Sequence, residues 1–314
     1  MINVIVTGAA GYIGGQIALQ LIDAGHTVIG IDRSPLPQHL QGSMQFVQAD
    51  VDSDQALMSM LKSMPDAVIH CAGTSLVGPS VKHPNDYYAN NFVKTKRLAD
   101  FVIQALPQTR LIFSSSAAVY GEPVLTPCHE VDPAQPISPY GQSKLMVEWM
   151  LESYRKAYGL DYVAFRYFNA CGADPQGRHG QAPGATHIIA RVLESIRDNQ
   201  EFTLYGNNYP TPDGTCVRDY VHVSDIAQAH VLALSQVVHS GIYNLGSNTG
   251  TSNQEIIDAA QRITGRRLQV KIDNRRDGDP AVLTASAEKF TELTPWRTHS
   301  LDDMIDHAWK WYVR

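Results

Sequence analysis

The feature that most constrains the fold is a glycine-rich turn near the N-terminus, set between a short apolar run and a segment with helical periodicity. Residues 2–6 are mostly apolar, residues 8–14 read Gly-Ala-Ala-Gly-Tyr-Ile-Gly, and apolar side chains recur at helical spacing from Ile17 to Ile22. This order predicts a strand, a tight turn and a helix. Backbone amides at such a helix start can hold a pyrophosphate, and glycines permit its close approach, although an ordinary tight turn has the same pattern.

A second predicted strand supports a dinucleotide site. Residues 28–32 are mainly apolar and end in Asp32, at about the distance from the glycines where a ribose 2′-hydroxyl needs an acceptor. Asp32 therefore favours NAD over NADP, whereas Arg33 beside it suits either a 2′-phosphate or plain solvation. Residues 46–51 predict a third strand, which places Asp50 near the expected adenine or in an ordinary loop.

Three further apolar runs predict strands that are buried on both faces of a sheet. They cover residues 67–73, 110–116 and 161–169, and a long helix is expected over roughly residues 86–105, between the first two. Strands that alternate with helices in this way predict an α/β fold with a doubly wound parallel sheet. Ligands bind such sheets at the carboxyl ends of the strands, so the polar residues that end these runs are candidate ligand contacts.

Residues 138–144 read Ser-Pro-Tyr-Gly-Gln-Ser-Lys and predict a helix start that can carry chemistry. Ser138 suits the N-cap and Pro139 the first helical position. Tyr140 and Lys144 then lie one turn apart on one face, where an ammonium can act on a phenol. Because a Tyr and a Lys at this spacing are usually an exposed pair without chemistry, the interpretation depends on the dinucleotide site around them.

Composition excludes several classes of protein. The 314 residues are 44% hydrophobic, which is ample for a large core, and a net charge of −6 gives no basic field for nucleic acid. The four cysteines and twelve histidines lack the spacing of a disulfide framework or a metal site, so we expect reduced cysteines and no metal. The N-terminal residues lack a basic leader and no apolar stretch reaches spanning length, so we expect a cytoplasmic protein without membrane contact.

The composition changes to glycine, proline and polar residues after the run at 161–169, which predicts a domain boundary near residue 170. We expect a first domain over residues 1–170, rejoined by about residues 219–247. A second domain then covers residues 171–314.

Several longer motifs point to a family. The most specific are Gly-Tyr-Ile-Gly at 11–14, Ser-Ser-Ser-Ala-Ala-Val-Tyr-Gly at 114–121, the segment at 138–144, Arg-Tyr-Phe-Asn at 166–169 and Val-Arg-Asp-Tyr-Val-His-Val at 217–223. With them the chain resembles the extended short-chain dehydrogenase/reductase family, and within it the enzymes that invert C4 of UDP-hexoses. The resemblance implies an NAD-binding Rossmann domain, a smaller C-terminal α/β domain for the nucleotide sugar, and a homodimer. It also implies NAD-dependent 4-epimerisation of UDP-galactose and UDP-glucose through a transient 4-keto sugar.

The resemblance also assigns site residues. It gives Tyr140, Lys144 and Ser116 as catalytic. Contacts to NAD are implied for Gly8, Gly11, Tyr12, Ile13, Gly14, Asp32, Asp50, Val51, Ala72, Gly73, Asn90, Ser114, Tyr140, Lys144 and Tyr167. Contacts to the UDP-sugar are implied for Ser116, Asn169, His187, Phe202, Thr203, Tyr205, Arg218, Tyr220, Arg276 and Asp279.

The implied chemistry needs a base for the sugar hydroxyl. A phenol with a pKa of about 10 is a poor base at neutral pH, so we expect Lys144 and the positive nicotinamide to lower the pKa of Tyr140. Ser116 would relay or orient the proton. Arg218 and Arg276 would hold the diphosphate, because a guanidinium binds phosphate in a bidentate fork.

Three departures from the family pattern leave the sugar open. His187 replaces a usual asparagine, Ser75 replaces a lysine found in some members, and Leu283 is intermediate in bulk where members admit or reject an N-acetyl group. UDP-N-acetylhexosamines and UDP-pentoses therefore stay as alternative substrates. A dehydratase is disfavoured because Ala117 and Ala118 stand where an acidic pair is needed, and a non-catalytic NAD sensor because the Tyr-Lys pair and Ser116 are kept.

Overall fold

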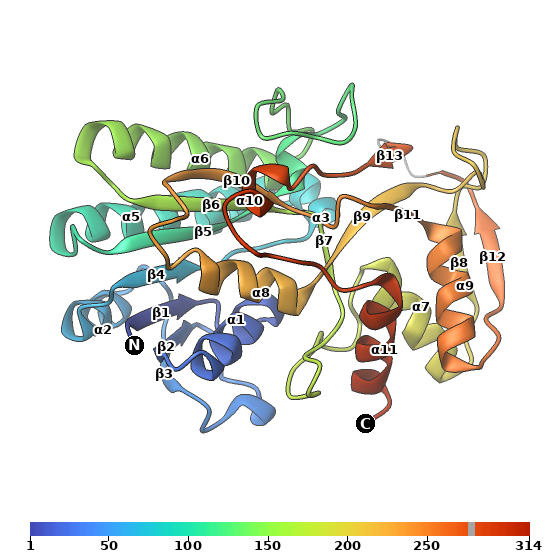
Figure 1. Ribbon diagram of the computed structural model, residues 1–314, viewed down its shortest axis with the longest axis horizontal. Helices are drawn as coiled ribbons and strands as arrows, with labels where there is room; N and C mark the ends of the chain where they lie inside the picture. The colour runs from blue at the N-terminus through green and yellow to red at the C-terminus, as the bar shows by residue number, and fades with distance from the viewer. Residues whose placement is uncertain (276–279) are drawn as a thin grey trace.

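A seven-stranded parallel sheet forms the centre of the N-terminal part of the chain (Figure 1). The computed structural model describes residues 1–275 and 280–314. The sheet order is β10-β6-β5-β4-β1-β2-β3, so the chain changes direction across the sheet between β1 and β4, which confirms the predicted doubly wound fold. The strands are β1 (Asn3–Thr7), β2 (Thr27–Asp32), β3 (Gln45–Gln48), β4 (Ala67–His70), β5 (Arg110–Ser116), β6 (Tyr162–Tyr167) and β10 (Gly241–Leu245).

Two layers of helices cover the sheet because successive strand residues point to opposite faces. Val4 and Val6 of β1 pack with α1 and α8 in one core, whereas Ile5 between them packs with α2, α5 and α6 in another. Figure 1 shows α5 and α6 on one side of the strands and α1 and α8 on the other. These helices are α1 (Tyr12–Asp23), α2 (Asp54–Ser63), α5 (Lys94–Ala105), α6 (Pro139–Tyr158) and α8 (Val223–Leu232).

The long helix predicted over residues 86–105 is wrong in detail, because it is broken. It consists of α4 (Pro84–Tyr87), a π-helical segment η2 (Tyr88–Val93) and α5. π-helical turns occur mostly inside α-helices and often at functional sites, and η2 carries Asn90, a predicted cofactor contact. Sequence periodicity cannot detect such a single-turn change of pitch.

The strand predicted over residues 161–169 is likewise divided. After β6 the backbone turns at Phe168, and β7 (Asn169–Cys171) pairs with β9 (Val217–His222) in a different sheet. That sheet also contains β11 (Gly250–Ser252) and β13 (Val282–Leu283). The residues that follow β6 therefore lie beside segments from the C-terminal half of the chain.

The C-terminal half has a core of its own. Helices α7 (Ile188–Asp198), α9 (Asn253–Thr264) and α11 (Leu301–Tyr312) pack together against β8 (Phe202–Tyr205), which pairs with β12 (Val270–Asp273). Shorter helices are η1 (Gln38–Leu40), α3 (Val77–Lys82), η3 (Ala117–Val119) and α10 (Glu288–Thr291). The division at residue 170 stays a prediction, although α8 and β10 do return to the large sheet.

No helix within residues 1–275 and 280–314 has the length and apolar character that a membrane crossing requires.

Candidate active site

The predicted glycine turn joins β1 to α1 and is shaped by contacts that exclude side chains. Gly8 has a φ of +74°, and a Cβ there would lie 2.7 Å from the amide nitrogen of Ala72. A Cβ on Gly14 would lie 2.2 Å from the carbonyl oxygen of Gly8. Only glycine fits either position, so the backbone is left bare where a pyrophosphate would approach the start of α1.

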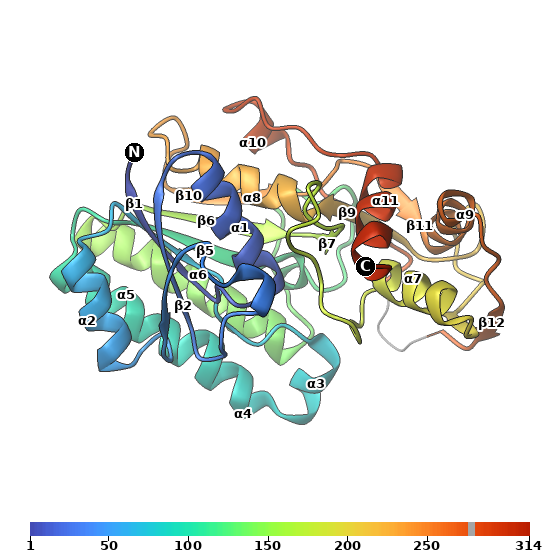
Figure 2. The same cartoon turned by 90° about the horizontal axis from the view of Figure 1, so that it is seen from below.

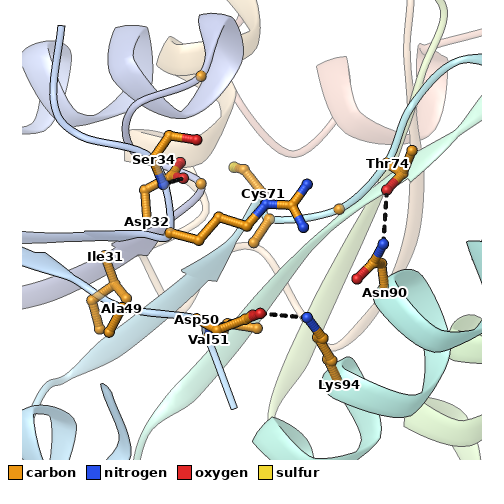
Figure 3. A pocket seen from close by; sticks show the side chains of 15 residues that line it. Ile31, Asp32, Ser34, Ala49, Asp50, Val51, Cys71, Thr74, Asn90 and Lys94 are labelled. Carbon is orange, nitrogen blue, oxygen red and sulfur yellow. Dashed lines mark hydrogen bonds and ion pairs between the residues drawn. The ribbon is translucent and has the colours of Figure 1, made fainter. Parts of the chain in front are cut away.

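A pocket opens beside this turn at the carboxyl ends of β1, β2, β3 and β4 (Figure 3). Eight of the predicted cofactor contacts line it: Gly8, Gly11, Asp32, Asp50, Val51, Ala72, Gly73 and Asn90. Seven lining residues were not predicted: Ile31, Arg33, Ser34, Ala49, Cys71, Thr74 and Lys94. The glycine turn and the Asp32 carboxylate at the end of β2, which both line this pocket, fit a dinucleotide such as NAD.

Two carboxylates in this pocket are held in place. Asp32 accepts hydrogen bonds from the amides of Ala10 (3.1 Å) and Ser34 (2.9 Å), one on each oxygen. Asp50 accepts one from the amide of Val51 (2.9 Å) and forms an ion pair with Lys94, which Figure 3 shows reaching across the pocket. Lys94 begins α5 immediately after the π-helical segment, and nothing in the local sequence marks it as a cofactor contact.

Seven predicted cofactor contacts lie outside the lining of this pocket, namely Tyr12, Ile13, Gly14, Ser114, Tyr140, Lys144 and Tyr167. The hydroxyl of Tyr12 turns away and donates to the carbonyl of Gly172 at 2.8 Å, and Ile13 packs on the core between β1 and α1. Gly14 acts through the tight turn rather than through a side chain. Tyr167 and Ser114 belong to a buried chain of hydrogen bonds behind the strands.

That chain of hydrogen bonds fixes the end of β5. His230 donates through Nδ1 to the carbonyl of Ile226 (2.8 Å), so its Nε2 accepts from the hydroxyl of Tyr167 (2.8 Å). Burial lowers the pKa of His230 to about 4 and keeps the ring neutral. Tyr167 is hydrogen-bonded in turn to the Ser114 hydroxyl at 2.9 Å. Its hydroxyl therefore supports the strand from behind instead of facing the pocket.

The segment at 138–144 forms the predicted helix start. The Ser138 hydroxyl accepts from the amide of Gly141 (3.2 Å), and Pro139 is the first residue of α6. Tyr140 and Lys144 are buried, at 9% and 5% exposure, so they are not the exposed helical pair of the alternative interpretation. The Lys144 ammonium donates to the carbonyl of Ser114 at 2.8 Å. Ser116 at the end of β5 lies near Tyr140, and its hydroxyl favours the ionised form of the phenol.

The environment shifts both pKa values, but not as expected for Tyr140. Burial raises the pKa of Tyr140, and its hydrogen bond with Ser116 lowers it by less. Burial lowers the pKa of Lys144 to about 8, although the charges of Cys71 and Glu148 act to raise it. The net lowering of the Tyr140 pKa that we expected is therefore wrong for the protein's own groups, because burial dominates and Lys144 is not among the groups that shift this pKa. Lys144 remains mostly cationic at neutral pH.

A buried ion pair anchors the helix that carries Tyr140. Glu148 of α6 binds Arg166 of β6 at 2.7 Å, with 1% and 4% of the two side chains exposed. The Ser115 hydroxyl donates to Glu148 at 2.5 Å, and Arg166 donates to the Tyr120 hydroxyl at 2.8 Å. These bonds join α6 to the ends of β5 and β6, so the position of the phenol is set by the sheet.

A second cleft, of about 990 Å³, separates the loop after β4 from α7 and β9. Figure 2 shows α3, which follows that loop, on the side facing α7. Four predicted substrate contacts line the cleft: Asn169, His187, Arg218 and Tyr220. Three others, Phe202, Thr203 and Tyr205, line a small pocket that adjoins it at α7. Arg276 and Asp279 lie outside the described residues.

The departures from the family pattern fall in the same region. Ser75 lines the cleft, and His187 is the N-cap residue of α7, where burial lowers its pKa. Leu283 packs against a cluster that contains Ala117, Phe168 and Leu145. Because Ala117 directly follows Ser116, this cluster lies next to the predicted catalytic residue in the chain. Arg191 also lines both cavities, and it stands four residues after His187, one helical turn further along the chain, so helical spacing from His187 could have found it.

One histidine cluster deserves comparison with a metal site. In the described part of the chain, His222, Asp225 and His299 are the group close enough to share an ion. His222 Nδ1 accepts from the Ser224 amide (3.0 Å), and His299 Nδ1 is bound to Asp225 (2.6 Å). With this tautomer, His222 Nε2 carries its proton towards His307 (3.1 Å), so hydrogen bonds within the cluster join α8 to α11.

Comparison with known proteins identifies the family. Residues 4–246 match the model of the NAD dependent epimerase/dehydratase family, which is more than half of the chain. The chain belongs to this family. A UDP-glucose 4-epimerase of Halalkalibacterium halodurans is 42% identical, over 98% of this chain and 95% of that protein.

Solved structures of this epimerase/dehydratase family have the same fold. UDP-glucose 4-epimerase from Brucella ovis, in complex with NAD, is 41% identical and superposes with a TM-score of 0.93 over 99% of this chain and 98% of its own. The enzyme from Stenotrophomonas maltophila, with bound NAD and formylated UDP-arabinopyranose, is 35% identical with a TM-score of 0.94 over 99% and 98%. The resemblance to C4-inverting enzymes is confirmed.

Proposed function

We propose that this chain inverts C4 of a UDP-sugar with the help of bound NAD, and that UDP-galactose and UDP-glucose are its substrates. One observation carries the proposal. The buried Lys144 ammonium lies 5.9 Å from the ring centroid of the buried Tyr140 and 3.7 Å from the place of a Cβ on Gly73, which lines the pocket that fits a dinucleotide. Family membership and UDP-glucose 4-epimerase relatives at full length support the same conclusion.

The residues of the first pocket would hold NAD. The bare turn at Gly8 and Gly14 would receive the pyrophosphate, and Asp32, fixed by two amides, would accept from the ribose hydroxyls. When bound, NAD supplies the acceptor and donor of a hydride at C4 together with a positive charge near Tyr140. That charge opposes the burial that raises the pKa of the phenol.

The protein's own groups handle the proton. The Tyr140 phenolate accepts the proton of the sugar 4-hydroxyl as C4 becomes a ketone, and Ser116 holds the sugar oxygen in reach. The Lys144 ammonium, fixed on the Ser114 carbonyl, stabilises the phenolate. Once the 4-keto ring has turned over, Tyr140 would return the proton to the C4 oxygen, and the hydride that bound NAD would return to the other face of C4 leaves no net oxidation.

The UDP moiety must stay bound while the sugar turns. Arg218 and Tyr220 on β9, with Asn169 on β7 and His187 at the start of α7, would hold the nucleotide in the second cleft. A solved relative that binds a UDP-pentose derivative keeps UDP-pentoses open as substrates, and Leu283 beside Ala117 keeps UDP-N-acetylhexosamines open. A dehydratase lacks support because Ala117 and Ala118 supply no acid or base.

We also propose a cytoplasmic homodimer that forms through α5 and α6. Trp149 on α6 is 63% exposed, which is unusual for so large an apolar side chain and suits a helix covered by a second copy. The four cysteines are all free, as suits a reducing compartment.

Product analysis tests the function. The purified protein should convert UDP-galactose to UDP-glucose with no NAD added or consumed, and one NAD per chain should be released on denaturation. Stoichiometric formation of NADH would instead indicate a dehydrogenase. Loss of water from the sugar would indicate a dehydratase.

A further inference from the structure

Among residues 1–275 and 280–314, Arg191 is the cationic residue that lines both the small pocket and the second cleft. Arg191 lies in the first turn of α7. Its guanidinium carbon lies 5.5 Å from the ring centroid of Phe202. No hydrogen bond or ion pair joins that guanidinium to another side chain within the described residues, whereas Arg197 on the same helix is paired with Asp198 at 2.7 Å.

The residues that line the two cavities indicate which part of a nucleotide sugar would lie beside Arg191. Phe202, Thr203 and Tyr205 line the small pocket, and two aromatic residues beside polar ones suit a nucleobase. The cleft runs from there to Asn169, which lies just beyond the β6 end that pairs with Ser116. The base would thus occupy one end and the reacting sugar the other.

We propose that Arg191 binds the diphosphate of the nucleotide sugar from the side of the nucleobase. In a UDP-sugar the ribose and diphosphate lie between base and sugar, and Arg191 stands between the two cavities. A guanidinium that rests on an aromatic face keeps its N–H edge available for a bidentate bond to phosphate. This proposal rests on the proposed binding of a UDP-sugar and adds a cation that the family pattern does not supply.

The contact has a mechanistic purpose. The sugar must turn over within the site while the nucleotide stays bound, so the grip has to lie on UDP alone. The Arg191 side chain is fixed by the first turn of α7 and by the Phe202 ring, so little freedom is lost when phosphate binds. Arg191 therefore adds affinity at a point that does not move during turnover.

Calorimetric titration of the NAD-loaded protein with uridine, UMP and UDP tests the proposal. Arg191→Met keeps the packing on Phe202 and removes the charge, so UDP affinity should fall roughly tenfold or more while uridine affinity changes less than about twofold. Arg191→Lys should lie between the two because it keeps a point charge. Arg197→Met, on the same helix outside both cavities, is the matched control and should bind UDP normally.

Unchanged UDP affinity in Arg191→Met would overturn the phosphate contact and leave the packing on Phe202 as the only role. An equal loss for uridine and UDP would also overturn it, because it would place the contact on the base. These results are separate from the function itself. A wild-type protein that binds UDP but forms no epimer would contradict the proposed reaction and not the role of Arg191.

Discussion

Four buried histidines make the stability of this protein depend on pH. His70, His179, His222 and His230 are at most 2% exposed, and burial lowers their pKa values to about 3, 4, 3 and 4. An unfolded histidine has a pKa of about 6.5, so between pH 6.5 and 4 the unfolded chain binds protons that the folded protein refuses. Stability is therefore full above pH 7 and falls as the pH drops.

The size of the effect follows from these pKa values. Going from pH 7 to pH 5.5 should cost about 1.2 kcal/mol of unfolding free energy for each of the four histidines. Asp219 acts in the opposite sense, because burial raises its pKa to about 6. Its protonation in the folded state stabilises the folded protein by about 0.8 kcal/mol over the same pH range. The net loss of unfolding free energy is therefore about 4 kcal/mol. The pKa of His299, raised by Asp225, reduces the loss further.

Urea unfolding of the NAD-loaded protein at pH 7.0 and 5.5, followed by circular dichroism, measures the difference. His179→Gln should shrink the difference by about 1.2 kcal/mol, because it removes one titrating group. His83→Gln at an exposed position is the matched control and should leave the difference unchanged. Equal stability of the wild-type protein at the two pH values would refute the assignment of neutral buried histidines.

Two other predictions concern the cofactor cradle and the anchor of α6. Gly14→Ala should abolish NAD retention, because its Cβ would lie 2.2 Å from the Gly8 carbonyl oxygen. Gly78→Ala is the control and should keep NAD, because a Cβ there meets nothing within 4 Å. The absorbance of the purified proteins measures the NAD that each retains. Glu148→Gln should lower the free energy of unfolding by about 3 to 5 kcal/mol, since it leaves the Arg166 charge buried without its partner. A loss below about 1 kcal/mol in urea unfolding would mean that solvent reaches Arg166.

Much of the N-terminal half could be predicted from sequence because its signals are local. Continuous apolar runs predicted the buried strands, and Ser138 with Pro139 predicted the first residue of α6. The break at η2 and the turn at Phe168 had no such signal, because a π-helical turn and a change of sheet are decided by tertiary contacts.

The candidate site shows the same division between local and long-range features. Glycines and carboxylates at strand ends were predictable, and eight of the predicted contacts line one pocket. Lys94 was missed because its ion pair with Asp50 joins segments 44 residues apart. Tyr167 was assigned to the cofactor site by resemblance alone, and its hydrogen bond to His230 joins residues 63 positions apart. Side chains with two possible partners cannot be oriented from sequence.

Turnover by Tyr140→Phe tests the central proposal most directly. The phenyl ring fills the same buried space and lacks only the oxygen that would exchange a proton with the sugar. With NAD and UDP binding intact, conversion of UDP-galactose to UDP-glucose should slow by roughly a hundredfold or more, the usual contribution of a general acid–base. Conversion within about threefold of the wild-type rate would contradict the assignment of Tyr140 as the base.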